Sequence, residues 1–269
     1  MGEKIARVAY RFDTSPATYD FVSFLANVER ARIEQGIDKF VLALVPGSRK
    51  WSDRDRVISD ERLAWRTNEL IPALATLLPS CISVIRGDFE KDQQTVSYLG
   101  APYAFGAYLS GPEYMQSLLP FKYPYITLTV RQSWFQEGRD TQPLWNKLIP
   151  ELGLPVVVVP DTEAEIEGIA CGVDKGIKYV PAAFNTRLRF ALYKKARLNL
   201  FMSNGPATLA LYSDIFAECF GLYVPQYSTC NAAALTNCGL HDGRRVQNTR
   251  FHWGRDEDTI LKTVRERLA

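Results

Sequence analysis

The sequence predicts an α/β protein built from two Rossmann-like domains that face each other across a cleft. Short apolar segments alternate with amphipathic segments along most of the 269-residue chain, as expected for parallel strands with helices on both faces of a sheet. Several of the apolar segments are nearly continuous, which is typical of strands buried on both faces. The alternation starts afresh after residue 122, so we expect one domain at 1–122 and a second at 123–269.

The first half is predicted to alternate strands with helices. Apolar residues at helical spacing indicate a helix between Ser15 and Gly36, with Pro16 at its first position and Gly36 as its stop. A second helix should bend or break at Pro72, because proline lacks the N–H that a helix interior needs. In order, we expect a strand at 6–12, the helix within 15–36, a strand at 39–47, a helix at 60–80, a strand at 81–88, and loops with a short helix at 90–122.

The second half repeats this pattern. Its last helix is amphipathic, and either Asp256 or Asp258 is a candidate to cap it. In order, we expect a strand at 125–131, a helix at 141–153, a strand at 155–161, a basic helix at 185–197, a strand at 198–203, a helix at 206–221, a strand at 222–227 and a helix at 256–268.

Composition narrows the class of protein. The 32 basic and 30 acidic residues leave a net charge of +2, which argues against a nucleic-acid binder because such a protein needs a concentrated basic face. The odd number of cysteines, five, and the presence of only two histidines, His241 and His252, argue against disulfides and structural zinc. Without a signal peptide or a membrane-length apolar run, we expect a cytoplasmic protein with at most peripheral membrane contact and leave its oligomeric state open.

Polar residues follow the strands predicted in the second half. These are Arg131, Gln132 and Ser133 after the first strand, Asp161 after the second, and the turn Ser203-Asn204-Gly205-Pro206 after the fourth. Ligands of open α/β sheets bind beyond the carboxyl ends of the strands, so these residues are candidates for a binding site.

The turn at 203–206 suits an anion. Gly205 would let the backbone approach a ligand closely, and a helix that begins near Pro206 would present N–H groups with a partial positive charge to phosphate. Arg131 could hold a diphosphate through its two-pronged guanidinium. Each feature also has a simpler interpretation. The turn at 203–206 is then an ordinary strand-to-helix turn, and Arg131 is a surface arginine in an ion pair.

Four segments of the second half resemble the C-terminal domains of GT-B glycosyltransferases. They are "ITLTVRQS", "VVVVPDTE", the basic helix and "NLFMSNGPATLALYSD", in that order. The resemblance is to the bacterial lipopolysaccharide heptosyltransferase group and related enzymes of surface-polysaccharide assembly. It implies that the turn from Ser203 to Ala207 carries the donor's diphosphate. "LTVRQS" is also similar to the strand of GT-B fucosyltransferases whose arginine binds the donor phosphate, which implies that role for Arg131.

The first half contains one further match, "YDFVSFLANV" at 19–28. It resembles the heptosyltransferase segment in which a Gly-Asp pair opens a helix and the aspartate acts as base, which implies that role for Asp20, although Tyr19 replaces the glycine. Asp13, at the end of the first strand, is the rival candidate. A carboxylate suits a base that takes a proton from the attacking sugar hydroxyl. Alternatively, Asp20 only favours the helix N-terminus by its charge, and Asp13 only caps a turn.

The resemblance implies a glycosyltransferase that moves a sugar from a nucleotide-diphosphate donor to a glycan or lipid-linked acceptor. The C-terminal half would bind the donor, and the N-terminal half would supply the acceptor site and the base. The GT-B-like layout that the resemblance implies needs no bound metal, so no obligatory metal or cofactor is expected. The charged and aromatic segment 241–258 is a candidate to close over the cleft. A sugar-nucleotide epimerase or hydrolase, and a non-catalytic nucleotide-sugar-binding protein, are the alternatives.

Overall fold

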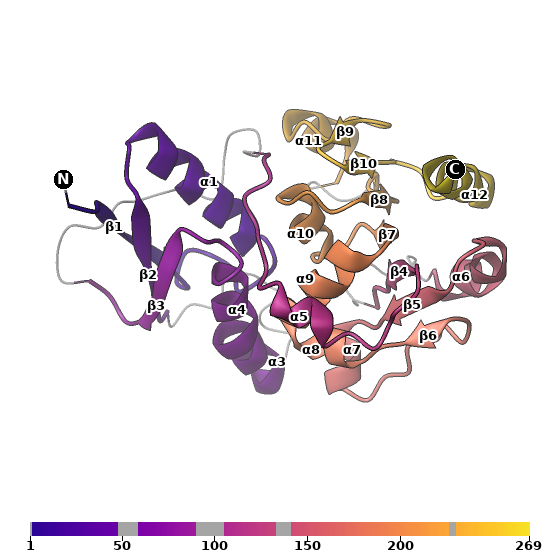
Figure 1. Ribbon diagram of the computed structural model, residues 1–269, viewed down its shortest axis with the longest axis horizontal. Coiled ribbons are helices and arrows are strands. Elements are labelled where there is room, and N and C mark those ends of the chain that lie inside the picture. Colours follow the sequence, from indigo (N-terminus) through magenta and orange to yellow (C-terminus); the bar gives the residue numbers. More distant parts are fainter. Residues whose placement is uncertain (1, 48–58, 90–104, 133–140, 226–229) are drawn as a thin grey trace. The chain divides into compact units, whose positions relative to one another are not determined.

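The computed structural model describes residues 2–47, 59–89, 105–132, 141–225 and 230–269. The chain divides into an N-terminal unit, Met1–Gly111, and a C-terminal unit, Pro112–Ala269. Both combine strands with helices (Figure 1). The division falls earlier than the boundary predicted after residue 122, so helix α5 (Tyr114–Ser117) belongs to the C-terminal unit. Among the described residues, none of the helices has the length and apolar character that crossing a bilayer requires.

The N-terminal unit contains a three-stranded parallel sheet in the order β1-β2-β3. All three of its predicted strands are confirmed. Proline 72 sits at the start of α4, directly after a π-helical stretch that interrupts the predicted helix at 60–80. The elements are β1 (Ile5–Arg11), α1 (Phe21–Glu34), β2 (Lys39–Val45), α3 (Asp60–Trp65), the π-helix η1 (Arg66–Leu70), α4 (Ile71–Ala75) and β3 (Cys81–Arg86).

Helix α1 begins later than predicted. It starts at Phe21, and Pro16 lies in the preceding turn, where its carbonyl accepts a 2.6 Å hydrogen bond from the Tyr10 hydroxyl. The start at Pro16 was therefore wrong, because this tertiary bond holds the proline in the turn. The predicted stop is confirmed by Gly36, whose φ of +60° suits glycine at a helix end. The apolar face of α1 packs through Phe21 and Phe24, whose ring centroids lie 4.7 and 4.8 Å from that of Tyr10.

The C-terminal unit contains a seven-stranded sheet in the order β6-β5-β4-β7-β8-β10-β9. Its strands are parallel except for the antiparallel pair β9–β10. The strands are β4 (Ile126–Thr129), β5 (Val156–Val159), β6 (Ile177–Lys178), β7 (Leu198–Met202), β8 (Ala217–Phe220), β9 (Arg245–Val246) and β10 (Thr249–Phe251). The helices, besides α5, are α6 (Gln142–Leu148), the 3-10 helix η3 (Ile149–Glu151), α7 (Thr162–Ile166), α8 (Pro181–Phe184), α9 (Thr186–Lys195), α10 (Ala207–Leu211), α11 (Ala232–Asn237) and α12 (Glu257–Leu268).

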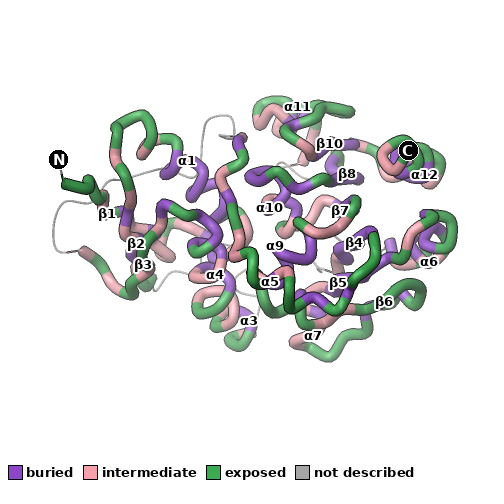
Figure 2. The backbone as a smooth tube through the Cα atoms, viewed as in Figure 1, coloured by how far each residue is buried: buried purple, intermediate pink, exposed green. Residues whose placement is uncertain are grey.

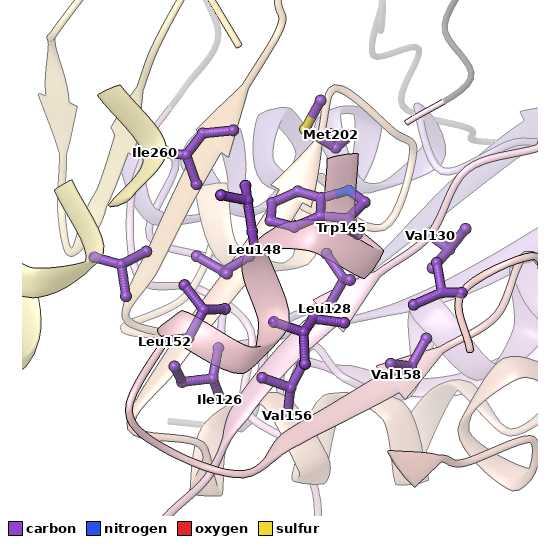
Figure 3. Close-up of a cluster of buried hydrophobic side chains, with 14 of the residues drawn as sticks. Ile126, Leu128, Val130, Trp145, Leu148, Leu152, Val156, Val158, Met202 and Ile260 are labelled. Carbon is purple, nitrogen blue, oxygen red and sulfur yellow. The ribbon is translucent and has the colours of Figure 1, made fainter. Parts of the chain in front are cut away.

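Both faces of the central strands are covered, and these strands are buried throughout (Figure 2). On one face the apolar residues of β4 and β5 meet α6 and α12 in a cluster of buried side chains, where Leu148 and Met202 flank the Trp145 indole (Figure 3). On the other face the Thr129 hydroxyl lies 2.6 Å from the Tyr193 hydroxyl of α9. This two-sided cover is the arrangement that near-continuous apolar strands require.

One predicted helix was wrong. The segment expected to be helical at 206–221 contains the short α10 followed by strand β8, and no strand is found at 222–225, where one was expected. Strand β8 pairs in parallel with both β7 and β10. The segment is a strand because its backbone N–H and C=O groups form hydrogen bonds with these two neighbouring strands. The predicted cap of the last helix is confirmed, since Asp256 Oδ1 accepts a 2.9 Å hydrogen bond from Thr259 N.

Candidate functional site

Three neighbouring parallel strands of the C-terminal unit, β4, β7 and β8, end at one edge of the sheet. This edge is where open α/β sheets bind ligands. Arg131 follows β4, the turn at 203–206 follows β7, and Gly221 follows β8. The topology therefore brings two of the predicted groups of residues to adjacent positions.

Arg131 joins the turns that follow β4 and β7. Its Nη1 donates a short hydrogen bond to the Ser203 carbonyl. Ser203 has a φ of +36°, a left-handed conformation that is uncommon for a residue other than glycine. The guanidinium is therefore held against the same turn for which the sequence predicted an anion site.

Several hydrogen-bonding groups of the turn from Ser203 to Ala207 already have partners within the protein. Asn204 Nδ2 donates to the Thr129 carbonyl at 3.1 Å, whereas Asn204 Oδ1 is buried with no hydrogen-bond partner among the described residues. Ala207 N donates to the Asn204 carbonyl at 3.1 Å and Thr208 N to the Gly205 carbonyl at 3.0 Å. The predicted helix start near Pro206 is confirmed, but its first N–H groups are engaged within the turn, and α10 is only five residues long.

Gln132 and Asp161 contact each other. Gln132 N donates to Asp161 Oδ2 at 3.2 Å, while Asp161 Oδ1 caps α7 by accepting from Glu163 N at 2.9 Å and Ala164 N at 3.2 Å. Asp161 thus has a structural task, which is to hold the turn after β4 against the start of α7. Ser133, the third residue predicted after this strand, lies outside the described residues.

A small pocket lies at this edge of the sheet. It is lined by Arg131, Thr141, Met202, Phe220, Gly221 and Arg255. Sequence reasoning found Arg131 but missed Thr141, Gly221 and Arg255. Gly221 was missed because the sequence wrongly predicted a helix at 206–221, so that no strand was expected to end before it. The sequence carried a signal for Arg255, because this residue belongs to the charged segment 241–258 that was expected to close over the cleft.

A buried ionic cluster supports the wall of this pocket. The Glu218 carboxylate is fully buried on β8, and His252 Nε2 lies 2.6 Å from its Oε2. Arg267 Nε approaches Oε1 at 2.6 Å without the alignment of a hydrogen bond, and burial lowers the pKa of Arg267 below its usual value. The His252 ring stacks on Phe220 with centroids 4.6 Å apart. The contacts of His252 with Glu218 and Phe220 therefore support the pocket wall from behind.

Lys194 and Lys195 of the basic helix α9 both contact other residues of the C-terminal unit. Lys194 forms an ion pair with Asp214, and Lys195 Nζ donates to the Phe121 carbonyl at 2.8 Å. Both contacts tie α9 to neighbouring segments. Among the described residues, no group of three or more His, Cys, Asp or Glu side chains is arranged to hold a metal ion.

The two carboxylates predicted in the N-terminal unit lie in different surroundings. Asp20 is exposed at the N-cap of α1, where Oδ2 accepts a 3.0 Å hydrogen bond from the Thr18 hydroxyl. Asp13 follows β1 and is partly buried, and its Oδ1 has no hydrogen-bond partner among the described residues. Gly47 packs on the Asp13 backbone so closely that a Cβ there would overlap it. Both carboxylates follow the first strand at the carboxyl-end edge of their sheet.

Comparison with solved structures shows the fold. The structure of a glycosyl transferase family 9 protein from Veillonella parvula is similar over 98% of this chain and 89% of that chain, with a TM-score of 0.54 and 12% identity. The E. coli heptosyltransferase WaaC with ADP-2-deoxy-2-fluoro heptose matches with a TM-score of 0.49 and 11% identity over 97% of this chain and 99% of that chain. The E. coli ADP-heptose lps heptosyltransferase II matches with a TM-score of 0.49 and 10% identity over 98% of each chain. No family model and no curated protein matches the sequence.

The predicted fold class is thereby confirmed. The chain is an α/β protein of the GT-B type, with two Rossmann-like units.

Proposed function

We propose that this protein is a glycosyltransferase that moves a sugar from a nucleotide-diphosphate donor to a glycan or lipid-linked acceptor in surface-polysaccharide synthesis. One observation carries the proposal: Arg131, held against the Ser203 turn, lines a pocket at the carboxyl ends of β4, β7 and β8. In a GT-B-type fold this edge of the C-terminal sheet suits a donor diphosphate. The matches to a glycosyl transferase family 9 protein and to heptosyltransferases support the proposal.

The C-terminal unit would bind the donor and stabilise its leaving group. As the bond between the sugar's anomeric carbon and the diphosphate oxygen breaks, negative charge develops on the diphosphate. A guanidinium fixed before the reaction offsets that charge without reorganising. Arg131 meets this condition, because its contact with the Ser203 carbonyl fixes its orientation.

The N-terminal unit would supply the acceptor site and the base. The acceptor hydroxyl oxygen forms the new bond to the anomeric carbon, and its proton passes to a carboxylate. Asp20 fits this role because its exposed carboxylate can be reached by a substrate, and the resemblance of its segment points to it. Asp13 fits because one of its buried oxygens has no partner among the described residues. The five cysteines form no disulfide, which supports a cytoplasmic location.

The proposal is tested by a thermal-shift screen against GDP-, UDP-, ADP-, CMP- and dTDP-sugars. A ligand that binds only the folded state stabilises it by about 2.7 kcal/mol at ~100 times its dissociation constant. The donor found in this way is then incubated with candidate acceptors, and products are followed by mass spectrometry. Stabilisation by a nucleoside-diphosphate sugar together with transfer would support the proposal. Turnover of donor without acceptor would indicate an epimerase or hydrolase, and binding without any turnover would indicate a binding protein.

A further inference from the structure

We propose that Arg255 and Thr141 complete the donor-phosphate site as a second guanidinium and a hydroxyl donor in the pocket that Arg131 lines, so that the pocket selects a diphosphate over a single phosphate. This inference rests on the proposed function of the C-terminal unit as the donor domain. It names two residues that the sequence did not indicate and a class of ligand that they select.

The pocket draws its lining from five places in the sequence, one of which is Met202 at the end of β7. Arg131 comes from the turn after β4, Thr141 from the residue before α6, Phe220 and Gly221 from the end of β8, and Arg255 from the segment between β10 and α12. The lining includes two arginines and no acidic residue. A pocket of this composition favours an anion that can accept hydrogen bonds from both arginines.

Thr141 provides the independent sign of a ligand. Its side chain is 2% exposed, and its Oγ1 has no hydrogen-bond partner among the described residues. Thr141 occupies the N-cap of α6, yet its hydroxyl does not cap the helix. A buried hydroxyl without a partner is unfavourable, and such groups are usually satisfied by a ligand or by water. A phosphate oxygen in the pocket would accept the hydrogen bond that the hydroxyl can donate.

Gly221 fixes where Arg255 lies. Its φ is +67°, and a Cβ at this position would lie 3.3 Å from Arg255 Cδ and 3.7 Å from Met202 Cε. Its N–H also donates a 2.8 Å hydrogen bond to the carbonyl of Gly254, the residue before Arg255. The glycine thus admits the stem of Arg255 beside the end of β8 and anchors the backbone that carries it.

Charge and geometry then favour a diphosphate. The diphosphate of a nucleotide sugar carries two negative charges, whereas the phosphodiester of a nucleoside-monophosphate sugar carries one. Two guanidinium groups match the former in charge, and each can bind two oxygens at once. A single phosphodiester group offers the two arginines fewer oxygens and less charge than a diphosphate does.

The test is isothermal titration of the whole protein with inorganic pyrophosphate, inorganic phosphate and nucleoside diphosphates. We expect Arg255→Gln to weaken pyrophosphate binding roughly 10- to 100-fold, since it removes charge-assisted hydrogen bonds, and to affect phosphate less. Arg255→Lys should recover part of the loss, because an ammonium keeps the charge but lacks the planar fork. Arg265→Gln is the matched control, because this arginine of α12 is exposed, pairs with Glu151 at 3.5 Å and is not part of the pocket lining.

Thr141→Val tests the hydroxyl separately. It should weaken pyrophosphate binding roughly tenfold, whereas Thr141→Ser should retain it. The melting temperature of the ligand-free protein should not fall in Thr141→Val, because the hydroxyl has no hydrogen-bond partner among the described residues that it could lose. A fall in melting temperature without a change in affinity would show that the hydroxyl is structural and would overturn its role.

The outcomes separate this inference from the proposed function. Equal pyrophosphate affinity in wild type and folded Arg255→Gln overturns the inference, even if the protein proves to be a glycosyltransferase. No pyrophosphate or nucleoside-diphosphate binding to the wild type also overturns it. Arg255-dependent pyrophosphate binding, in a protein that transfers no sugar from any donor, supports the diphosphate pocket and overturns the transferase.

Discussion

At the carboxyl ends of their strands, the two sheets of this protein present opposite chemistry. The N-terminal sheet has Asp13 and Asp20 after β1, and there Arg11 and Asp88 neutralise each other at 2.6 Å. The C-terminal sheet has Arg131 and Arg255 around a pocket. Both edges follow parallel strands of α/β units, so the fold alone does not set the chemistry. The residues in the turns do. The proposed transfer would use a carboxylate as its base and a guanidinium to stabilise its leaving group.

The largest expected effect tests the carboxylate edge. Asp20→Asn keeps the shape of the side chain but cannot take up the acceptor's proton, so transfer should fall by ~10²–10⁴-fold while donor affinity stays unchanged. Rates are measured with saturating donor, and affinity is measured by titration. Asp13→Asn is the paired variant: if it alone causes the loss, Asp13 is the base. A wild-type rate in the double variant would remove both carboxylates from the chemistry.

The next effect tests the guanidinium edge. Arg131→Ala should weaken nucleoside-diphosphate binding roughly 10- to 100-fold, because charge-assisted hydrogen bonds contribute about 1.5–3 kcal/mol each. Arg131→Lys should restore only part of the affinity. Calorimetric titration gives both values. If the two edges differ as proposed, Asp20→Asn alters only the transfer rate, whereas Arg131→Ala alters the affinity for nucleoside diphosphate. Unchanged affinity in Arg131→Ala would show that Arg131 only connects the turns that follow β4 and β7.

A smaller effect separates two residues of one turn. Ser203, with its φ of +36°, is the left-handed residue, and Gly205 is not among those with positive φ. Ser203→Val should therefore lower the free energy of unfolding by about 1–2 kcal/mol, whereas Gly205→Val at an exposed position should change it by less than about 0.5 kcal/mol. Urea denaturation measures both.

Gly205→Val then tests the turn as a phosphate contact. If the backbone there touches the donor, the folded variant loses nucleotide affinity because a branched side chain blocks the approach. Full donor affinity in this variant would confine the phosphate site to the arginine-lined pocket.

The smallest effect concerns acid stability of the N-terminal unit. Burial alone would raise the pKa of Glu29, but hydrogen bonds from Arg32 and Ser80 hold it below its usual value. A carboxyl with a lowered folded-state pKa contributes stability above its unfolded-state pKa of about 4.3, and this contribution is lost as the pH falls through the folded-state pKa. Glu29→Gln should therefore cost about 1 kcal/mol at pH 7 and less below pH 4. Chemical denaturation at the two pH values checks this, and an equal cost at both would exclude the ionised carboxylate as the cause.

The sequence by itself determined the strands whose side chains are apolar without interruption and the residues directly beyond them. The four valines of β5 favour a buried strand, and Arg131 directly follows the apolar segment that contains β4. Strong local patterns of this kind need no knowledge of distant residues. They sufficed for the α/β class and for placing Arg131 and the turn at 203–206 at one edge.

Only the tertiary structure decided β8 and the pocket that begins at its end. No Gly or Pro separates the helix α10 from the segment Ala217–Phe220. The segment is a strand because its backbone forms hydrogen bonds with both β7 and β10. The same pairing brings Gly221 against Gly254 and so sets Arg255 in the pocket that Arg131 also lines. Thr141 joins them from a third segment. Contacts between residues far apart in the chain depend on the packing of whole elements, which no local pattern records.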